Sequence, residues 1–218
     1  HMDIKYIFNT NPHKIKYTKS KIPKRKIDDE QWKTFEGNIY KIGHEKKDFS
    51  YDNEQPMHKV YIQPFKIHKQ FVSNKDYVHF IEDEGYSKPA LWLSKGWDWI
   101  KEKDIIKPEY WYKKDNKWYE FTLHGLLPIS DNAPVSHISY YEASAYAKWK
   151  RCRLPTEEES EIYLKNPEIN KTRNNKNIYQ AYDTDIATNN LWWWTKSHYS
   201  AYPGYIAFNG DIEEYNEK

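Results

Sequence analysis

The stretch SYYEASAYAKWKRCRLPTEEESEIYL, residues 139–164, contains two helix starts separated by one helix stop. Ser139 is followed three residues later by Glu142, and Thr156 is followed three residues later by Glu159. This is the spacing of a capping box, in which the hydroxyl and the carboxylate each accept a hydrogen bond from a backbone N–H of the first turn. The proline between the two boxes disfavours a helical conformation at the residue before it. We therefore predict two capped helices joined by a stiff corner.

The composition favours one domain that relies on aromatic residues for its core. The chain has 218 residues, of which 38% are hydrophobic and 17% are aromatic, with ten Trp and twenty Tyr. Aromatic side chains bury a large area each, so a small number can build a core. No stretch approaches the ~20 consecutive apolar residues that a membrane span needs. The single Cys152 cannot form an internal disulfide. We therefore expect a cytoplasmic protein with no membrane partner.

Positive charge is concentrated near the start of the chain. Residues 3–26 hold eight Lys and Arg against one Asp, although the net charge of the whole chain is only +2. Such a run predicts a solvated arm or linker, and it is accompanied by no motif for nucleic-acid binding. The opening His-Met is typical of a cleaved tag. We expect a tag remnant and basic linker over 1–34, one domain over 35–218, and no nucleic-acid partner.

Shorter patterns complete the expected secondary structure. Ser73 is a helix N-cap candidate, and the apolar spacing after it predicts a helix over about 74–84. The second main helix follows Ser139, over about 140–150. The predicted strands are 35–43, 58–69 with a break at Pro64, 109–112, 117–121 and a buried strand at 191–195. The aromatic stretch 86–122 has no single period, so we otherwise expect ordered irregular structure there. These elements predict an α+β fold.

The order of several motifs resembles one known family. SYYEASAYAKW and RLPTEEE resemble the signature of the formylglycine-generating-enzyme-like domain, also called the sulfatase-modifying-factor domain. The motifs FSYDNEQPMHKVYIQPFKI, KPEYW, FTLHGLLPI, APVSHISYYEA and AYPGYIAFNGDIEEYN are similar to the branch found in ergothioneine-biosynthesis sulfoxide synthases. The resemblance covers nearly the whole chain. It implies a fold related to C-type-lectin-like domains, with short strands, two main helices and much irregular structure.

The resemblance also implies an activity. Enzymes of this branch are nonheme-iron oxidoreductases that join a thiol, γ-glutamylcysteine or cysteine, to the imidazole of trimethylhistidine, using O₂ and Fe(II). In these enzymes a DinB-like helical domain carries a His-x-x-x-His-x-Glu iron motif. The C-terminal domain closes the active site and helps to bind the substrates. The chain resembles this C-terminal domain.

No His-x-x-x-His-x-Glu motif occurs in the chain, and none of its nine His has a partner four residues away. Two His at that spacing would share one helical face. We therefore expect no metal ligands in this chain, Fe(II) only from a separate DinB-like domain or subunit, and no activity of the chain alone. Members of the family continue past the EEYN motif into an Arg-Gly-Gly-Ser strand. The resemblance thus implies a domain that is truncated at its C-terminus.

Four aromatic residues are the candidate site residues that the resemblance implies. Tyr205 and Tyr215 are the catalytic candidates, because tyrosines just before the final strand reach the iron site in some relatives. A tyrosine hydroxyl suits proton transfer because it can both donate and accept a hydrogen bond. Tyr202 and Trp194 are the substrate-binding candidates. The alternative is that these residues pack their rings and hydrate their polar tips. We interpret the polar turn 52–54 as one that holds the fold.

Three hypotheses for the function stay open at this point. The chain is one part of an iron-dependent sulfoxide synthase, a non-catalytic ligand- or protein-binding module, or an inactive fragment on the same fold. A fold alone does not decide among them. A neighbouring gene for a DinB-like protein would favour the first.

Overall fold

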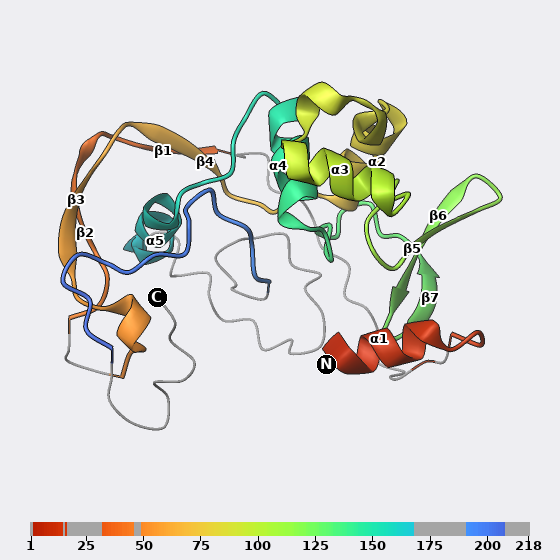
Figure 1. Ribbon diagram of the computed structural model, residues 1–218, viewed down its shortest axis with the longest axis horizontal. Coiled ribbons are helices and arrows are strands. Elements are labelled where there is room, and N and C mark those ends of the chain that lie inside the picture. The colour runs from red at the N-terminus through yellow and green to blue at the C-terminus, as the bar shows by residue number, and fades with distance from the viewer. Residues whose placement is uncertain (1, 15, 17–31, 46–48, 168–190, 208–218) are drawn as a thin grey trace. The chain divides into compact units, whose positions relative to one another are not determined.

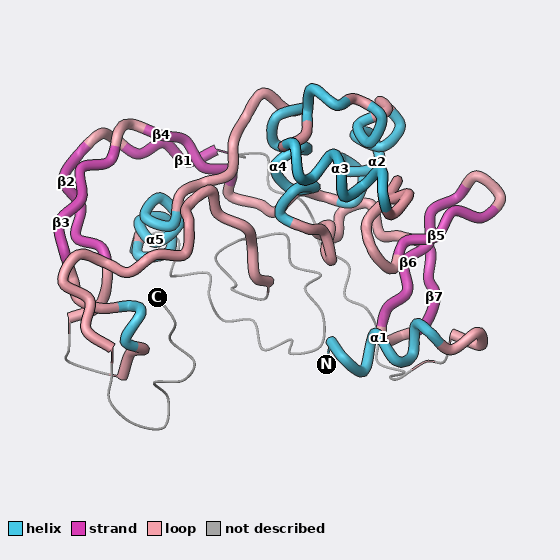
Figure 2. Tube along the Cα trace, viewed as in Figure 1, coloured by secondary structure: helices cyan, strands magenta, loops and turns pink. Residues whose placement is uncertain are grey.

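The computed structural model describes residues 2–14, 16, 32–45, 49–167 and 191–207 (Figure 1). Figure 2 shows helices, short strands and long irregular connections along this part of the chain. The fold class is α+β, as predicted, and the strands pair in antiparallel fashion. The chain divides into two compact units that are each built from separate segments. Among the described residues, unit one contains 2–14, 16, 70–154 and 191–192, and unit two contains 32–45, 49–69, 155–167 and 193–207.

Unit one combines four helices with a three-stranded sheet among the residues described. The helices are α1 (Met2–Thr10), α2 (Asn74–Glu82), α3 (Ser94–Glu102) and α4 (Tyr140–Trp149). Two single-turn 3₁₀ helices, η2 (Gly85–Ser87) and η3 (Pro89–Leu91), connect α2 with α3. The strands β5 (Trp111–Lys114), β6 (Lys117–Thr122) and β7 (Gly125–Pro128) pair in the order β5-β6-β7. No helix in the described part of the chain is long and apolar enough to cross a membrane.

The core of unit one is mostly aromatic, as the composition predicts. Tyr77 of α2 stacks on Tyr146 of α4 with 5.5 Å between ring centroids, and Phe80 meets the same ring edge-on at 5.8 Å. The small side chain of Ala145 is fully buried, which lets these rings approach α4 closely. The buried members of the core are Tyr77, Phe80, Tyr86, Trp92, Ile100, Trp111, Ala145 and Tyr146.

A buried carboxylate links the start of α4 to this core. Ser139 and Glu142 form the predicted capping box, in which the Ser139 N–H donates to Glu142 Oε2 at 2.7 Å. Glu142 is only 3% exposed, and its other oxygen accepts from the Tyr86 hydroxyl at 2.5 Å. Because the Tyr86 proton is used in this way, the Tyr77 hydroxyl, 3.1 Å away, is the donor to Tyr86. The cap therefore also orders two core tyrosines.

The helix α3 lies in the stretch for which the sequence predicts irregular structure, so that prediction is wrong for residues 94–102. The residue before the helix is Leu93, whose side chain makes no capping hydrogen bond, and Gly96 within it is a poor helix former. Local signals for a helix are therefore weak. Packing compensates, because Ile100 is buried and Trp97 and Trp99 pack against the aromatic core.

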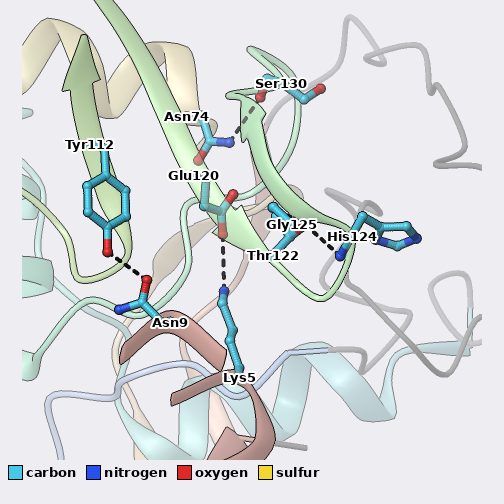
Figure 3. Close-up of polar contacts among 9 residues, drawn as sticks. All are labelled: Lys5, Asn9, Asn74, Tyr112, Glu120, Thr122, His124, Gly125 and Ser130. Carbon is cyan, nitrogen blue, oxygen red and sulfur yellow. Dashed lines mark hydrogen bonds and ion pairs between the residues drawn. The ribbon is translucent and has the colours of Figure 1, made fainter. Parts of the chain in front are cut away.

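The helix α1 packs against the three-stranded sheet (Figure 3). Lys5 is 6% exposed and pairs with Glu120 of β6 at 3.4 Å, with its ammonium 4.7 Å from the centre of the Tyr110 ring. Asn9 accepts a hydrogen bond from the Tyr112 hydroxyl at 2.6 Å. For Lys5 the expectation of a solvated arm is therefore wrong. A count of charges cannot show that a lysine stem is buried while its ammonium finds a partner.

Unit two contains two antiparallel strand pairs and one helix among its described residues. Strand β1 (Trp32–Phe35) pairs with β4 (Phe65–His68), and β2 (Asn38–Ile42) pairs with β3 (His58–Ile62). The break between β3 and β4 falls at Gln63–Pro64, as the proline predicts. A 3₁₀ turn, η1 (Asp52–Glu54), precedes β3. The boundary between linker and domain at residue 34 remains a prediction.

The helix of unit two is α5 (Glu157–Lys165), and it covers the β1–β4 pair. Thr156 and Glu159 form the second predicted capping box. Phe35 and Phe65 stack with 4.8 Å between centroids, and Tyr163 of α5 meets Phe35 edge-on at 6.4 Å. Both helix starts in the stretch 139–164 are thus confirmed.

The predicted buried strand at 191–195 is wrong. This stretch has an irregular backbone, Trp192 is fully exposed and Trp194 is 49% exposed. The indole N–H of Trp193 donates to Ser160 Oγ of α5 at 3.3 Å. An apolar run indicates burial only where neighbouring strands are available, and here the indole uses its polar tip on a helix instead.

The buried pair between Lys5 and Glu120 yields a stability prediction. Lys5→Met leaves Glu120 as a buried charge without its cation, so we expect a loss of about 3 kcal/mol in the free energy of unfolding. The double variant Lys5→Met/Glu120→Leu should recover most of that loss, because both charges are removed. Urea denaturation measures all three proteins. Lys103→Met is the control, because its pair with Glu102 is well exposed and such pairs contribute about 1 kcal/mol or less. Equal losses for Lys5→Met and Lys103→Met would contradict this account.

Glu142 yields a prediction of pH dependence. Burial raises the pKa of Glu142 above its usual value, against the opposing effect of hydrogen bonds from Ser139 and Tyr86. The folded state then binds a proton more tightly than the unfolded state, so this group's stabilisation is present at low pH and is lost as pH rises through the raised pKa. Denaturation between about pH 4 and pH 8 should show this fall in the wild type and a smaller one in Glu142→Gln. Glu102→Gln is the control, because the Glu102 side chain at the end of α3 is exposed and lies outside the core. Identical profiles for the wild type and Glu142→Gln would refute the assignment.

Candidate functional site

Two of the predicted site residues occupy the ends of one tight turn in unit two. The Tyr205 N–H donates to the Tyr202 carbonyl at 2.9 Å, which closes a four-residue turn. Pro203 sets the backbone of the second position, and Gly204 at the third has a φ of +80°. This sequence and conformation fit a type II β-turn, whose third position requires a positive φ. We call residues 202–205 the tyrosine turn. The turn fixes the backbone positions of Tyr202 and Tyr205 relative to each other.

The hydroxyl of Tyr205 donates to Asp52 Oδ2 at 3.0 Å. Asp52 begins the 3₁₀ turn η1 and is only 2% exposed. The backbone around it is fixed, because the Gln55 N–H donates to the Asp52 carbonyl at 3.0 Å and the Tyr51 N–H donates to Glu54 Oε2 at 2.8 Å. Asp52 therefore presents its carboxylate to Tyr205 from a rigid support.

A second backbone constraint supports η1 from the end of β2. Gly43 has a φ of +93°, and a Cβ at this position would lie 2.8 Å from the Pro56 carbonyl oxygen. The next residue, His44, donates its N–H to the Glu54 carbonyl at 2.7 Å. Only glycine permits both this conformation and this approach. The polar turn 52–54 thus holds the fold, as predicted, and also contacts a candidate catalytic residue.

The hydroxyl of Tyr202 donates to Glu157 Oε1 of α5 at 3.0 Å. Its ring lies against the imidazole of His58, the first residue of β3, with 4.6 Å between centroids. His58 Nδ1 lies 3.1 Å from the Pro56 carbonyl oxygen. Because a carbonyl can only accept, Nδ1 carries a proton and donates to it. The tyrosine turn is therefore lined by two carboxylates and one imidazole.

The electrostatics of the tyrosine turn keep both phenols protonated. Burial raises the pKa of Tyr202 well above its usual value, and the neighbouring carboxylate of Glu157 raises it further. Loss of hydration raises the pKa of Tyr205, followed by the hydrogen bond to Asp52 and its negative charge. A phenolate next to a carboxylate would place two negative charges about 3 Å apart, which is unfavourable. Both hydroxyls are thus neutral hydrogen-bond donors at neutral pH.

For the other two predicted site residues, Trp194 and Tyr215, the structure gives less information. Trp194 is half exposed in the irregular stretch that precedes the tyrosine turn, so part of its ring is open to solvent. Tyr215 lies outside the described residues. Among the residues that the structure describes, no three His, Cys, Asp or Glu side chains lie close enough to hold a metal ion. The described part of the chain therefore does not fit an iron triad of two His and one carboxylate.

Three residues of this site were not predicted from the sequence as site residues, namely Asp52, His58 and Glu157. Asp52 lies 153 positions before Tyr205, and Glu157 lies 45 positions before Tyr202. No spacing rule connects positions so far apart. The available signals were the polar turn 52–54 and the Pro-Gly pair between two tyrosines, which predicts a turn but not its contacts.

Comparison with known proteins agrees with the motifs. Residues 20–213 match the sulfatase-modifying factor enzyme 1-like domain family. Hercynine oxygenase of Mycolicibacterium smegmatis is 38% identical over 113 residues, which are 51% of this chain and 26% of that protein. Ergothioneine biosynthesis protein 1 of Schizosaccharomyces pombe is 33% identical over 113 residues, 51% of this chain and 12% of that protein. Inactive C-alpha-formylglycine-generating enzyme 2 of Mus musculus is 33% identical over 126 residues, 51% of this chain and 40% of that protein.

The matches differ in what they establish. The chain spans about a quarter of the length of the hercynine oxygenase that it matches. The similarity alone therefore does not assign the activity of the whole relative to this chain. The family match is broader, because it covers most of the 218 residues. Together with the α+β fold and the two capping boxes, it shows that the chain belongs to the sulfatase-modifying factor enzyme 1-like domain family.

Proposed function

We propose that this chain is the substrate-binding domain of an Fe(II)- and O₂-dependent sulfoxide synthase of the ergothioneine type. The proposed reaction joins a thiol, γ-glutamylcysteine or cysteine, to trimethylhistidine. The observation that carries the proposal is the 38% identity to hercynine oxygenase over half of this chain. The tyrosine turn supports it, because two protonated phenols are held on fixed carboxylates in one half-exposed segment.

The proposal assigns roles to the predicted residues. Tyr205 is the catalytic candidate that carries a proton to the reacting groups, and Tyr215 keeps the same proposed role from the sequence. Tyr202 and Trp194 contact substrate through a phenol and a half-exposed indole face. A neutral phenol can serve as a proton donor because it retains its proton at working pH.

The iron has a separate proposed source. The described residues do not fit an iron triad, so we assign Fe(II) to a DinB-like domain or subunit that associates with this chain. When bound there, the iron supplies the oxygen chemistry of the reaction. The residues of this chain bind and orient the substrates and hold a proton at the Tyr205 hydroxyl.

A non-catalytic binding module is the second candidate. The mouse relative whose name describes it as inactive shows that proteins named for lost activity occur among similar sequences. In that case the tyrosine turn would serve ligand binding or folding only. The reconstitution below separates the two candidates.

Reconstitution with a DinB-like iron domain tests the proposal. We expect no sulfoxide from the chain alone, and product when the iron domain, Fe(II), O₂, trimethylhistidine and a thiol are all present. Mass spectrometry detects the product, with γ-glutamylcysteine and cysteine supplied in separate reactions. Product from the chain alone would overturn the two-part assignment. No product with any iron-domain partner would favour the binding module or the inactive fragment.

Variants of the reconstituted enzyme test the role of Tyr205. Tyr205→Phe removes the hydroxyl and keeps the ring, so loss of a proton donor should lower the rate about 10²–10⁴-fold. Tyr61→Phe is the matched control, because Tyr61 is an exposed tyrosine on β3 of the same unit. A rate for Tyr205→Phe within a few-fold of the Tyr61→Phe rate would show that the Tyr205 hydroxyl is not catalytic.

A further inference from the structure

The structure contains a buried carboxylate at the tyrosine turn whose role the proposed function leaves open. Asp52 is 2% exposed and sits at the start of η1. A carboxylate loses its hydration at such a position, so hydrogen bonds from the protein must replace it. One of these comes from Tyr205 at 3.0 Å. Asp52 is therefore coupled directly to the proposed catalytic phenol.

We propose that Asp52 is a positioning residue, which holds the Tyr205 hydroxyl in the free enzyme and keeps the phenol neutral, so that Tyr205 still has its proton to donate when substrate binds. This inference rests on the proposed function for the reaction that Tyr205 serves, but the coupling between Asp52 and Tyr205 does not depend on that reaction. A phenol has one proton, and the geometry directs it to Asp52 Oδ2. Removing that proton would leave a phenolate beside a carboxylate.

The support beneath Asp52 makes this orientation rigid. The buried side chain of Gln55 donates to Ser50 Oγ at 2.5 Å. Two bonds between Tyr51 and Glu54 close η1: the Tyr51 N–H donates to Glu54 Oε2 at 2.8 Å, and the Glu54 N–H donates to the Tyr51 carbonyl at 3.2 Å. On the other side of the bond, Gly204 of the tyrosine turn packs near the Pro56 ring, since a Cβ added there would lie 3.6 Å from Pro56 Cγ. Both partners are thus held by their backbones, as preorganisation of a reacting group requires.

Asp52 and Tyr199 are the groups whose charge raises the pKa of Tyr205 in the described part of the chain. Tyr199 comes from the loop before the tyrosine turn and accepts a hydrogen bond from Asn53 at 3.1 Å. Of these two groups, Asp52 is the one that accepts the hydrogen bond from the Tyr205 hydroxyl, at 3.0 Å. Asp52→Asn keeps the shape and removes the charge of this carboxylate.

Titration of the phenols by NMR on carbon-13 tyrosine-labelled chain tests the coupling without substrate or iron. In the wild type the Tyr205 signal, assigned by its loss in Tyr205→Phe, should titrate above the ordinary phenol pKa of about 10. In Asp52→Asn its pKa should fall toward that value, whereas the Tyr202 signal should keep its pKa. The matched variant Glu157→Gln should give the reverse, because Glu157 accepts from Tyr202.

Two results of the titration would overturn the role proposed for Asp52. An ordinary pKa for Tyr205 in the wild type would overturn the proposal, and this measurement does not require Asp52→Asn to fold. A folded Asp52→Asn protein with an unchanged Tyr205 titration would overturn it as well. In the reconstituted enzyme, Asp52→Asn should move the alkaline limb of the kcat profile to lower pH. If that enzyme forms no product, the proposed function fails, while the titration still decides the role of Asp52.

Discussion

The site of unit two is organised by a constraint on Asp52, because a carboxylate that is 2% exposed must receive hydrogen bonds from the protein. Tyr205 meets part of that requirement at 3.0 Å. The turn from Tyr202 to Tyr205 must then adopt a conformation that brings the second hydroxyl to Asp52, and Pro203 and Gly204 supply it. The position of one buried charge thus accounts for the geometry of a candidate catalytic segment.

Unit one also contains a nearly buried carboxylate that accepts a hydrogen bond from a tyrosine, but there the contact is structural. Glu142 is also a nearly buried carboxylate, and it accepts from the Tyr86 hydroxyl and from the backbone at the start of α4. There the tyrosine is itself buried in the aromatic core, so the contact holds helices together. Tyr205 is half-buried at the end of a turn, so its contact leaves the phenol near solvent. The pair of Tyr86 and Glu142 is therefore structural, whereas the pair of Tyr205 and Asp52, whose phenol lies near solvent, is a candidate functional pair.

Local features of this fold could be predicted from the sequence, whereas distant contacts could not. The caps at Ser139 and Thr156 are contained within four residues each, and both occur as predicted. The bond between Asp52 and Tyr205 joins residues 153 positions apart, and no local pattern encodes it. The strand predicted at 191–195 failed because an apolar run alone does not supply a neighbouring strand. Family resemblance located the tyrosines, but only the structure connected Tyr205 and Tyr202 to their carboxylates.

Binding of substrate at the tyrosine turn is the central claim, and chemical-shift mapping tests it most directly. Carbon-13 tyrosine-labelled chain would be titrated with trimethylhistidine and with γ-glutamylcysteine, each up to about 10 mM, a range that detects weak binding. The account predicts saturable shifts of the Tyr202 and Tyr205 signals, with the signal of Tyr112 in unit one unchanged. No saturable change at the tyrosine turn, or changes confined to tyrosines of unit one, would contradict it.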